Sequence, residues 1–546
     1  MNTLKANLVD AFAKQVYPVL IEFDKKIMKV ERLADQPDPN MPYLMPGFID
    51  AHVHIESSML IPSEFARIAV THGTVSTLSD PHEIANVCGV DGVQFMIDNG
   101  KRVPFKFNFG APSCVPATDF ETAGAAIDSQ QVLQLLMADD IKYLAEMMNF
   151  PGVLNNDPEV LRKIAHAKRL GKPVDGHAPG LMGAEALAYI KAGISTDHEC
   201  FTREEAEGKL SAGMKILIRE GSAAKNFEAL IDLLHDHEDE IMFCSDDKHP
   251  DSLVEGHINQ LCARAVAKGV DIFKVIKAAC INPVFHYKLD VGLLRVNEPA
   301  DFILVQDLKQ FKVLQTFIDG TLVAEKGQTK IESLLAHPVN NFKTKEIKLK
   351  DLRFEKDNGM LDAEDRFAVI QAYDGQLITG RKDWLLKEQA GAWVPDTEND
   401  ILKIVVVNRY QDSVPAMGFI NGFGFKAGAI ASSVAHDSHN IVAVGTSDED
   451  LLNAINMVIR EKGGVSFANK EDQEILPLPV AGLMSAEDGY QVAQTYARMD
   501  NMAKKLQSSL SAPYMTLSFM ALLVIPALKL SDKGLFDGQR FSFIKQ

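Results

Sequence analysis

Residues 46–54 read PGFIDAHVH, an apolar run that ends in two histidines one residue apart. Side chains alternate between the two faces of a β-strand, so His52 and His54 point the same way and can bind one cation. Imidazole binds zinc, iron and manganese, and a cation held there prepares water for attack on a substrate. The alternative is a surface strand that carries two histidines by chance. The rest of the chain favours the metal site.

Between His52 and Asp247, short β-rich runs alternate with longer helix-like stretches, which is the pattern of a parallel sheet wrapped by helices. Eight candidate strands end near residues 54, 80, 113, 148, 178, 199, 222 and 247. Eight strand and helix units predict an α/β fold with a closed (β/α)8 TIM-like barrel, whose reactive groups project from the carboxyl ends of the strands. A doubly wound open sheet is the structural alternative. It needs an early glycine fingerprint for phosphate, and the sequence has none.

The segments on either side of the barrel have a different pattern. Residues 8–30 and 292–327 are short alternating runs, with a turn at Asp319 and Gly320, and predict one small β-sandwich subdomain built from both flanks. A polar, lysine-bearing stretch at 327–350 is typical of a linker, and a region with its own strands and helix follows. We therefore expect the β-subdomain at 1–45 and 291–340, the barrel at 46–290 and a C-terminal α+β domain at 341–546.

Bulk composition limits the classes of function. The chain has 546 residues and a formal net charge of −18, and it shows no basic stripe, which argues against a nucleic-acid surface. No uncharged run reaches membrane-spanning length, and residues 1–10 lack the apolar core of a signal peptide. Six cysteines without a paired spacing are typical of reduced thiols. We expect a cytoplasmic homo-oligomer that binds neither nucleic acid nor membrane.

Candidate metal ligands fall at the ends of the predicted strands, which meet at one mouth of a barrel. They are four imidazoles and two carboxylates: His52, His54, Glu146, His177, His198 and Asp246. Each one alone has another explanation, because a lone histidine is more often a hydrogen-bonded structural residue and a lone carboxylate an ion pair or a solvated turn. Their shared position favours a site for two cations, with Glu146 as the bridging carboxylate.

The run at 46–54, the separate strand-end histidines and the final aspartate resemble the amidohydrolase superfamily of metal-dependent barrel hydrolases and deaminases. Longer stretches are similar to its adenine deaminase branch: IESSM at 55–59, DPHEI at 80–84, EMMNFP at 146–151, GHAPG at 176–180 and SDDKHPD at 245–251. The similarity covers the barrel, the flanking β-subdomain and the C-terminal region. Many members of the superfamily bridge their metals with a carboxylated lysine on the fourth strand, where this chain has Glu146. The adenine deaminase branch tolerates this difference.

The resemblance implies hydrolytic deamination of adenine to hypoxanthine and ammonia in purine salvage, by a metal-bound hydroxide at a binuclear centre. It implies two Mn²⁺ or Fe²⁺ ions, although the donors also suit zinc. Asp246 is placed to move the hydroxide proton to the departing ammonia. Glu146 can protonate a ring nitrogen, so whether it mainly bridges metals or mainly transfers protons stays open. Glu83, His82 and Asp247 are candidates for binding the purine edge, or else support the metal ligands.

The sequence excludes two other classes of metal hydrolase and leaves two alternatives open. No Cys-x-x-Cys occurs, which excludes the nucleobase deaminases with a Pro-Cys-x-x-Cys zinc site, and Asn86 lies four residues beyond His82, which excludes the His-Glu-x-x-His proteases. Hydrolysis of a cyclic amide or an N-acyl amino acid could use the same metals, with Lys248 or Arg203 binding a substrate carboxylate. A catalytically inactive barrel scaffold is the non-enzymatic alternative, and the intact ligand set speaks against it.

The C-terminal region contains a polar run, Ser432 to Asn440, in which Ser, His and Asp lie close together in sequence. A nucleophilic triad is defined by spatial roles, and no Gly-x-Ser-x-Gly turn accompanies the run. We expect a loop that packs against the barrel or against another subunit. Whether it reaches the substrate is open at this point.

Overall fold

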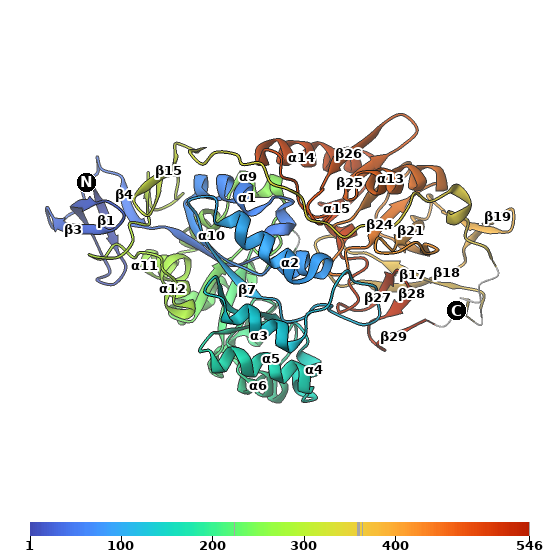
Figure 1. Ribbon diagram of the computed structural model, residues 1–546, viewed down its shortest axis with the longest axis horizontal. Coiled ribbons are helices and arrows are strands. Elements are labelled where there is room, and N and C mark those ends of the chain that lie inside the picture. The colour runs from blue at the N-terminus through green and yellow to red at the C-terminus, as the bar shows by residue number, and fades with distance from the viewer. Residues whose placement is uncertain (223, 357–360, 363, 545–546) are drawn as a thin grey trace.

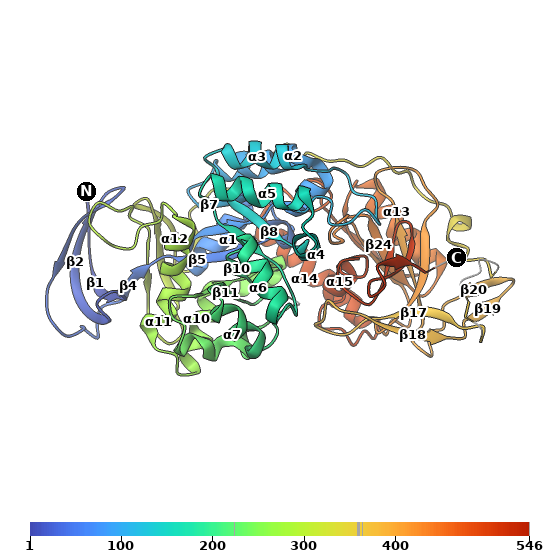
Figure 2. The same ribbon diagram turned by 90° about the horizontal axis from the view of Figure 1, so that it is seen from below.

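The computed structural model describes residues 1–222, 224–356, 361–362 and 364–544. Figure 1 shows three parts in a row: an N-terminal sheet, a helix-covered barrel and a C-terminal part rich in strands. The view from below in Figure 2 shows the same order. Within the described ranges, no helix combines the length and the apolar composition that a bilayer crossing requires.

Eight parallel strands form the barrel and follow one another in sequence order. They are β5 (Phe48–Val53), β6 (Thr74–Ser79), β7 (Lys106–Ala111), β8 (Ile141–Met147), β9 (Val174–Gly176), β10 (Thr196–Asp197), β11 (Lys215–Arg219) and β12 (Ile241–Cys244). The first five pair in one sheet and the last three in another. The Ser195 amide donates to the Val174 carbonyl (2.8 Å), and the Asp246 amide donates to the His52 carbonyl (2.9 Å). These two contacts close the ring and confirm the predicted (β/α)8 barrel.

Helices cover the outside of the barrel, and local signals explain where several of them begin. Asp128 caps α3 (Ser129–Met137) in a capping box with Gln131, and Asp157 caps α5 (Pro158–Arg169), with Pro158 at the first position. Every residue of β5, β6 and β12 is buried, as expected for parallel strands covered on both faces. The helices are α1 (Pro62–Ala69), α2 (His82–Gly100), α3 (Ser129–Met137), α4 (Phe150–Leu154), α5 (Pro158–Arg169), α6 (Gly183–Ala192), α7 (Arg203–Ser211), α8 (Phe227–Leu230), α9 (Pro250–Glu255), α10 (Ile258–Ala267), α11 (Ile272–Ile276) and α12 (Asn282–Tyr287).

Both flanks of the barrel contribute to one eight-stranded sheet, as the sequence predicted. Its order is β16 (Gln328–Thr329), β15 (Thr321–Glu325), β14 (Val313–Ile318), β13 (Phe302–Val305), β4 (Tyr43–Pro46), β1 (Asn2–Asp10), β2 (Gln15–Phe23) and β3 (Ile27–Arg32). Phe23 of β2 packs edge-on against Phe317 of β14 with ring centroids 5.6 Å apart, although three strands separate them in the sheet. In a flat sheet four strand spacings would put them about 19 Å apart. The sheet therefore folds over on itself and packs like a sandwich.

The C-terminal part is an α+β unit, as predicted. Its main sheet has the order β18 (Gly380–Trp384), β17 (Phe367–Gln371), β22 (Ala416–Asn421), β21 (Leu402–Val407), β24 (Ile441–Gly445), β23 (Ala429–Ser432), β25 (Gly464–Ala468) and β26 (Gln473–Pro477). Helix α13 (Asp448–Arg460) buries Leu451, Ile455 and Val458 against one face of this sheet. The remaining elements are β19 (Lys387–Gln389), β20 (Ala392–Val394), α14 (Gly489–Lys505), α15 (Pro513–Ser518), β27 (Leu528–Ser531), β28 (Gly534–Asp537) and β29 (Ser542–Phe543).

The C-terminal part packs against the barrel at the carboxyl ends of its strands. The Ser485 amide donates to the Met59 carbonyl (2.8 Å), just beyond β5. On the other side, the Thr122 hydroxyl in the loop after β7 donates to Asp532 (2.6 Å). These contacts bring C-terminal residues over the mouth of the barrel, where the predicted ligands lie.

Candidate active site

The two histidines of the 46–54 run point at one another. His52 is in β5 and His54 directly follows it, and their Nε2 atoms are 3.2 Å apart in a buried position. The Nδ1 atom of His54 contacts the Asp80 carbonyl (3.1 Å), which fixes the ring, whereas Nδ1 of His52 has no hydrogen-bond partner among the residues that the structure describes. Two imidazole nitrogens directed at a common point are arranged as they would be around a cation.

Glu146 lies between two groups of imidazoles. Its Oε2 atom is 2.8 Å from Nδ1 of His177 and 3.1 Å from Nε2 of His198. Its Oε1 atom is 3.4 Å from Nε2 of His54 and 3.3 Å from Nδ1 of His82. Burial alone would raise the pKa of Glu146, but the charges and hydrogen bonds of His177 and His198 outweigh it and hold that pKa well below its usual range. The ionised carboxylate of Glu146 therefore directs one oxygen to His177 and His198 and the other to His54 and His82.

Asp246 completes the cluster from the end of β12. Its Oδ1 atom is 3.2 Å from Nε2 of His54 and 3.5 Å from Nε2 of His52. Its backbone has φ +55°, in the left-handed region that residues other than glycine enter at a cost of about 1 kcal/mol or more. Such a conformation persists only where the surroundings enforce it, and here the pairing of residue 246 with β5 does so.

The donor set fits a divalent metal centre. Two sets of three ligand atoms each lie within 4.8 Å of one another: those of His52, His54 and Asp246, and those of His52, Glu146 and His198. Burial disfavours a charge on His54, but Asp246 and Glu146 outweigh burial and raise its pKa well above the usual value. The carboxylates that attract a proton to this position also attract a metal ion. The structure thus brings together all six predicted ligands, with His82 close to them.

Sequence reasoning missed the role of two buried residues. Arg219 ends the buried strand β11 and forms ion pairs with Asp246 and, through both terminal nitrogens, with Glu199. Glu199 Oε1 is 3.6 Å from ring nitrogens of both His177 and His198. An arginine at the end of a buried strand was a usable signal, because arginine is almost never fully buried without a partner.

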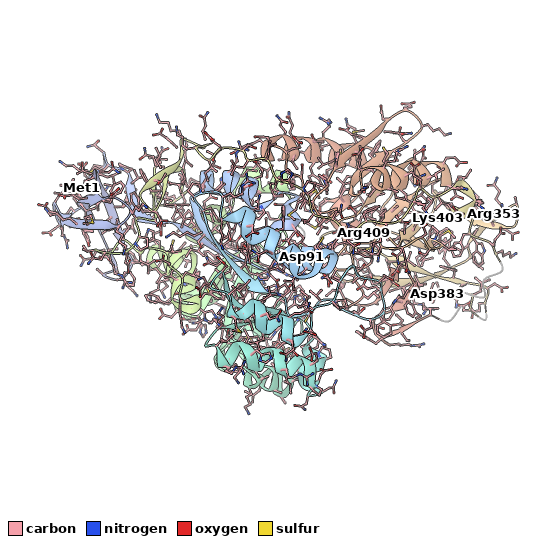
Figure 3. All side chains as sticks on the ribbon, viewed as in Figure 1. Met1, Asp91, Arg353, Asp383, Lys403 and Arg409 are labelled. Carbon is pink, nitrogen blue, oxygen red and sulfur yellow. The ribbon has the colours of Figure 1, made fainter. Side chains whose placement is uncertain are left out.

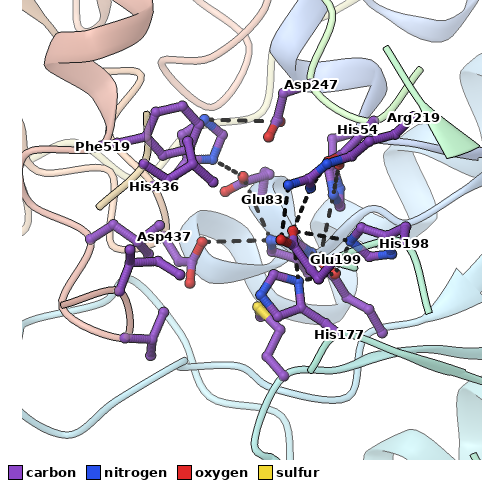
Figure 4. A pocket seen from close by; sticks show the side chains of 18 residues that line it. His54, Glu83, His177, His198, Glu199, Arg219, Asp247, His436, Asp437 and Phe519 are labelled. Carbon is purple, nitrogen blue, oxygen red and sulfur yellow. Dashed lines mark hydrogen bonds and ion pairs between the residues drawn. The ribbon is translucent and has the colours of Figure 1, made fainter. Parts of the chain in front are cut away.

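The predicted substrate-edge residues His82, Glu83 and Asp247 all line the same cavity. His82 faces Glu146 and lies 3.2 Å from Asp80. Asp247 accepts a hydrogen bond from the Ser57 hydroxyl (2.5 Å). Figure 4 shows the cavity from close by.

The run from Ser432 to Asn440 packs against the barrel of its own chain and reaches the cavity, which His436 and Asp437 line. Two of its hydroxyls are bonded to backbone atoms: Ser432 to Val434, and Ser433 to Gly482. Neither hydroxyl contacts a histidine among the described residues, so the run does not form a nucleophilic triad through these serines.

The basic groups proposed for a substrate carboxylate do not lie in the cavity. Arg203 is exposed at the start of α7 and pairs with Glu207 (2.7 Å), and the buried Lys248 is outside the cavity lining. Among the described lining residues, the only lysine or arginine is Arg219, whose charge is already shared by two carboxylates. The site therefore offers little to an N-acyl amino acid.

The barrel and its cluster of imidazoles and carboxylates define a metal-dependent hydrolase, and residues 43–323 match the model of the amidohydrolase family. Residues 376–542 match the adenine deaminase C-terminal domain. Adenine deaminase from Sulfurovum sp. strain NBC37-1 is 54% identical over 543 residues, 99% of each chain, and that from Salinibacter ruber is 53% identical over 545 residues, 99% of this chain and 98% of the other. Adenine deaminase from Methanosarcina mazei is 50% identical over 544 residues, 98% of each chain. The chain belongs to the adenine deaminase family.

Proposed function

We propose that this protein hydrolyses adenine to hypoxanthine and ammonia, in purine salvage. The observation that carries the proposal is the position of Glu146, whose two oxygens face separate groups of imidazoles while Asp246 faces His52 and His54. The relatives named adenine deaminase match this chain over nearly its full length. The lack of an unpaired basic group in the described cavity lining disfavours the amide-hydrolase alternative.

The reaction forms a bond from water oxygen to C6 of adenine and breaks the bond from C6 to the amino nitrogen, which leaves as ammonia. We assign the metal ions to His52, His54, Glu146, His177, His198 and Asp246. Bound divalent ions supply water acidic enough to attack at neutral pH.

Asp246 is the base in this proposal. Arg219 binds its Oδ2 atom, while Oδ1 lies 3.2 Å from Nε2 of His54. Burial would raise the pKa of Asp246, but Arg219, His52 and His54 outweigh burial and keep that pKa well below its usual range, so the carboxylate is ionised and can accept a proton. It takes the proton of the attacking water and delivers it to the departing amino group. Because both oxygens of Glu146 face imidazoles, we assign Glu146 mainly to bridging and only secondarily to proton transfer.

We also propose the identity of the metal, the cellular compartment, the oligomeric state and the domain limits. Imidazole and carboxylate donors without a thiolate suit Mn²⁺ or Fe²⁺, with zinc as the third candidate. The net charge of −18 and the free cysteines support a cytoplasmic protein that binds neither nucleic acid nor membrane. We also propose self-association into a homo-oligomer and the domain limits 1–45 with 291–340, 46–290, and 341–546.

Metal analysis combined with an ammonia assay tests the function. Protein reconstituted with Mn²⁺ is incubated separately with adenine, adenosine and cytosine, and ammonia is measured. We expect about two metal equivalents per chain, as a bridged pair requires, and ammonia from adenine alone. Folded protein that carries Mn²⁺ or Fe²⁺ and releases no ammonia from adenine would contradict the proposal.

A further inference from the structure

The segment Val434–Asn440, called here the His436 loop, inserts a C-terminal imidazole into the cavity of the barrel. The ring of His436 stacks on Phe519 with centroids 4.7 Å apart and planes 10° from parallel. Its Nδ1 atom contacts Glu83, and its backbone amide donates to the Ser518 carbonyl (3.0 Å). Figure 4 shows the ring between Phe519, Glu83 and Asp247. Two sides of the ring are therefore fixed by the protein.

Side chains of Arg409 and Tyr410 hold the backbone of the His436 loop by hydrogen bonds. Arg409 is fully buried and donates to the His439 carbonyl (3.2 Å) and to the Ala481 carbonyl (2.6 Å). The Tyr410 hydroxyl donates to the Ser438 carbonyl (2.6 Å). In Figure 3, Arg409 lies where the barrel meets the C-terminal sheet. The position of the His436 side chain is therefore fixed, and recognition of a ligand requires side chains that are fixed in this way.

Glu83 is not free to bind a purine directly. Its Oε1 atom contacts Nδ1 of His436, and its Oε2 atom contacts Nε2 of His439. Burial would raise the pKa of Glu83, but the charges of His436, His439 and His82 outweigh burial and hold that pKa well below its usual range. Glu83 therefore acts as an ionised anchor that orients His436.

His436 lines the cavity, and its Nε2 atom is the ring nitrogen that does not contact Glu83. It is 4.0 Å from Oδ1 of Asp247, beyond hydrogen-bond distance. Beside His436 and Asp437, the C-terminal part lines the cavity with apolar side chains, which form one wall: Leu377, Phe519, Leu522, Val524 and Ile525. A flat heteroaromatic base has an apolar face for such a wall and ring nitrogens for an imidazole.

We propose that His436 is a substrate-binding residue: its Nε2 atom forms a hydrogen bond with a ring nitrogen of adenine while the base packs on the apolar wall. This inference rests on the proposed function and extends it. The active site is then composite, with the metal side supplied by the barrel and one edge of the base recognised by the C-terminal domain.

The test compares His436→Gln and His436→Phe with a matched control, His249→Gln. His249 is also a buried histidine between the two parts, bonded to Tyr496 of α14, but it does not line the cavity. We expect both His436 variants to raise KM for adenine roughly tenfold to a hundredfold, as expected for one lost hydrogen bond to a buried partner. Metal content should stay at the wild-type value, and the control should keep the wild-type KM.

A second readout separates recognition from structure. Calorimetric affinities are measured for adenine and for 1-, 3-, 7- and 9-deazaadenine, each of which lacks one ring nitrogen. Wild type should discriminate against one analogue, and His436→Phe should bind that analogue and adenine equally. The inference is overturned if the variants keep every wild-type discrimination, if wild type binds no purine, or if the His249 control raises KM equally. Wild-type protein that binds adenine but releases no ammonia would contradict the proposed function. The calorimetric comparison of wild type with His436→Phe would still test whether His436 binds the base.

Discussion

Replacing Arg219 by methionine isolates the ion pairs behind the metal centre. The guanidinium is 2% exposed and pairs with both Glu199 and Asp246. Removing one partner of a buried ion pair costs about 3–5 kcal/mol because it leaves a charge without compensation. For a cooperative unit of 150–250 residues, a loss of that size lowers Tm by roughly 6–20 °C. We expect this loss in metal-free protein and a smaller one with Mn²⁺ bound, since the ions also neutralise Asp246.

Scanning calorimetry of the metal-free and Mn²⁺-loaded forms measures this prediction. Arg162→Met is the control, because Arg162 pairs with Glu159 while 55% exposed, and such pairs contribute about 0–1 kcal/mol. The double variant Arg219→Met with Glu199→Gln should recover part of the loss, because the unpaired glutamate charge is gone. A metal-free Arg219→Met protein that is as stable as the Arg162→Met control would refute the reasoning.

Three further predictions concern turnover, metal content and pH. Asp246→Asn should keep its metal but lose several orders of magnitude in kcat for adenine, and near-normal activity would remove Asp246 from the proton path. Glu146→Gln should bind less than the wild-type metal content by elemental analysis because it loses the charged ligand assigned to both ions, whereas Asp246→Asn leaves that ligand in place; unchanged content would argue against bridging. Burial lowers the pKa of Lys529 from 10.5 to about 7, and the ammonium donates to the Leu377 and Phe519 carbonyls. Between about pH 7 and pH 10.5 the unfolded chain binds more protons at Lys529 than the folded protein does, so the contribution of Lys529 to the free energy of unfolding rises with pH. Lys529→Met should flatten that rise in urea titrations at several pH values. A pH profile of stability equal to that of the wild type would contradict this prediction.

The barrel was predictable because its signals are local. Each observed strand ends one to three residues before its predicted end, since runs of buried apolar residues and the polar residues after them are visible in one stretch of sequence. The ligands at those ends converge because parallel strands of a barrel share one mouth. Counting strands was therefore enough to place His52 and Asp246 side by side without knowing any contact between them.

The C-terminal share of the site was not predictable in the same way. His436 and Glu83 meet across 353 residues, and no local pattern in either segment indicates the other. The role of Arg219 was not predicted for the same reason, because its partners Glu199 and Asp246 follow other strands of the barrel. Contacts of this kind depend on tertiary packing, which periodicity and composition do not encode.

The folded-over N-terminal sheet has a consequence for synthesis of the chain. Strand β4 pairs with β1 on one side and with β13 on the other, as in the contact of Leu44 with Leu304. The outer edge of β4 therefore stays unpaired until the whole barrel has been translated. At about 5–20 residues per second, that interval is roughly 13–50 s on the ribosome. During it, an unpaired edge strand is open to other nascent chains. The earliest-made segment is therefore among the last to be completed, and it is where we expect chaperones to bind.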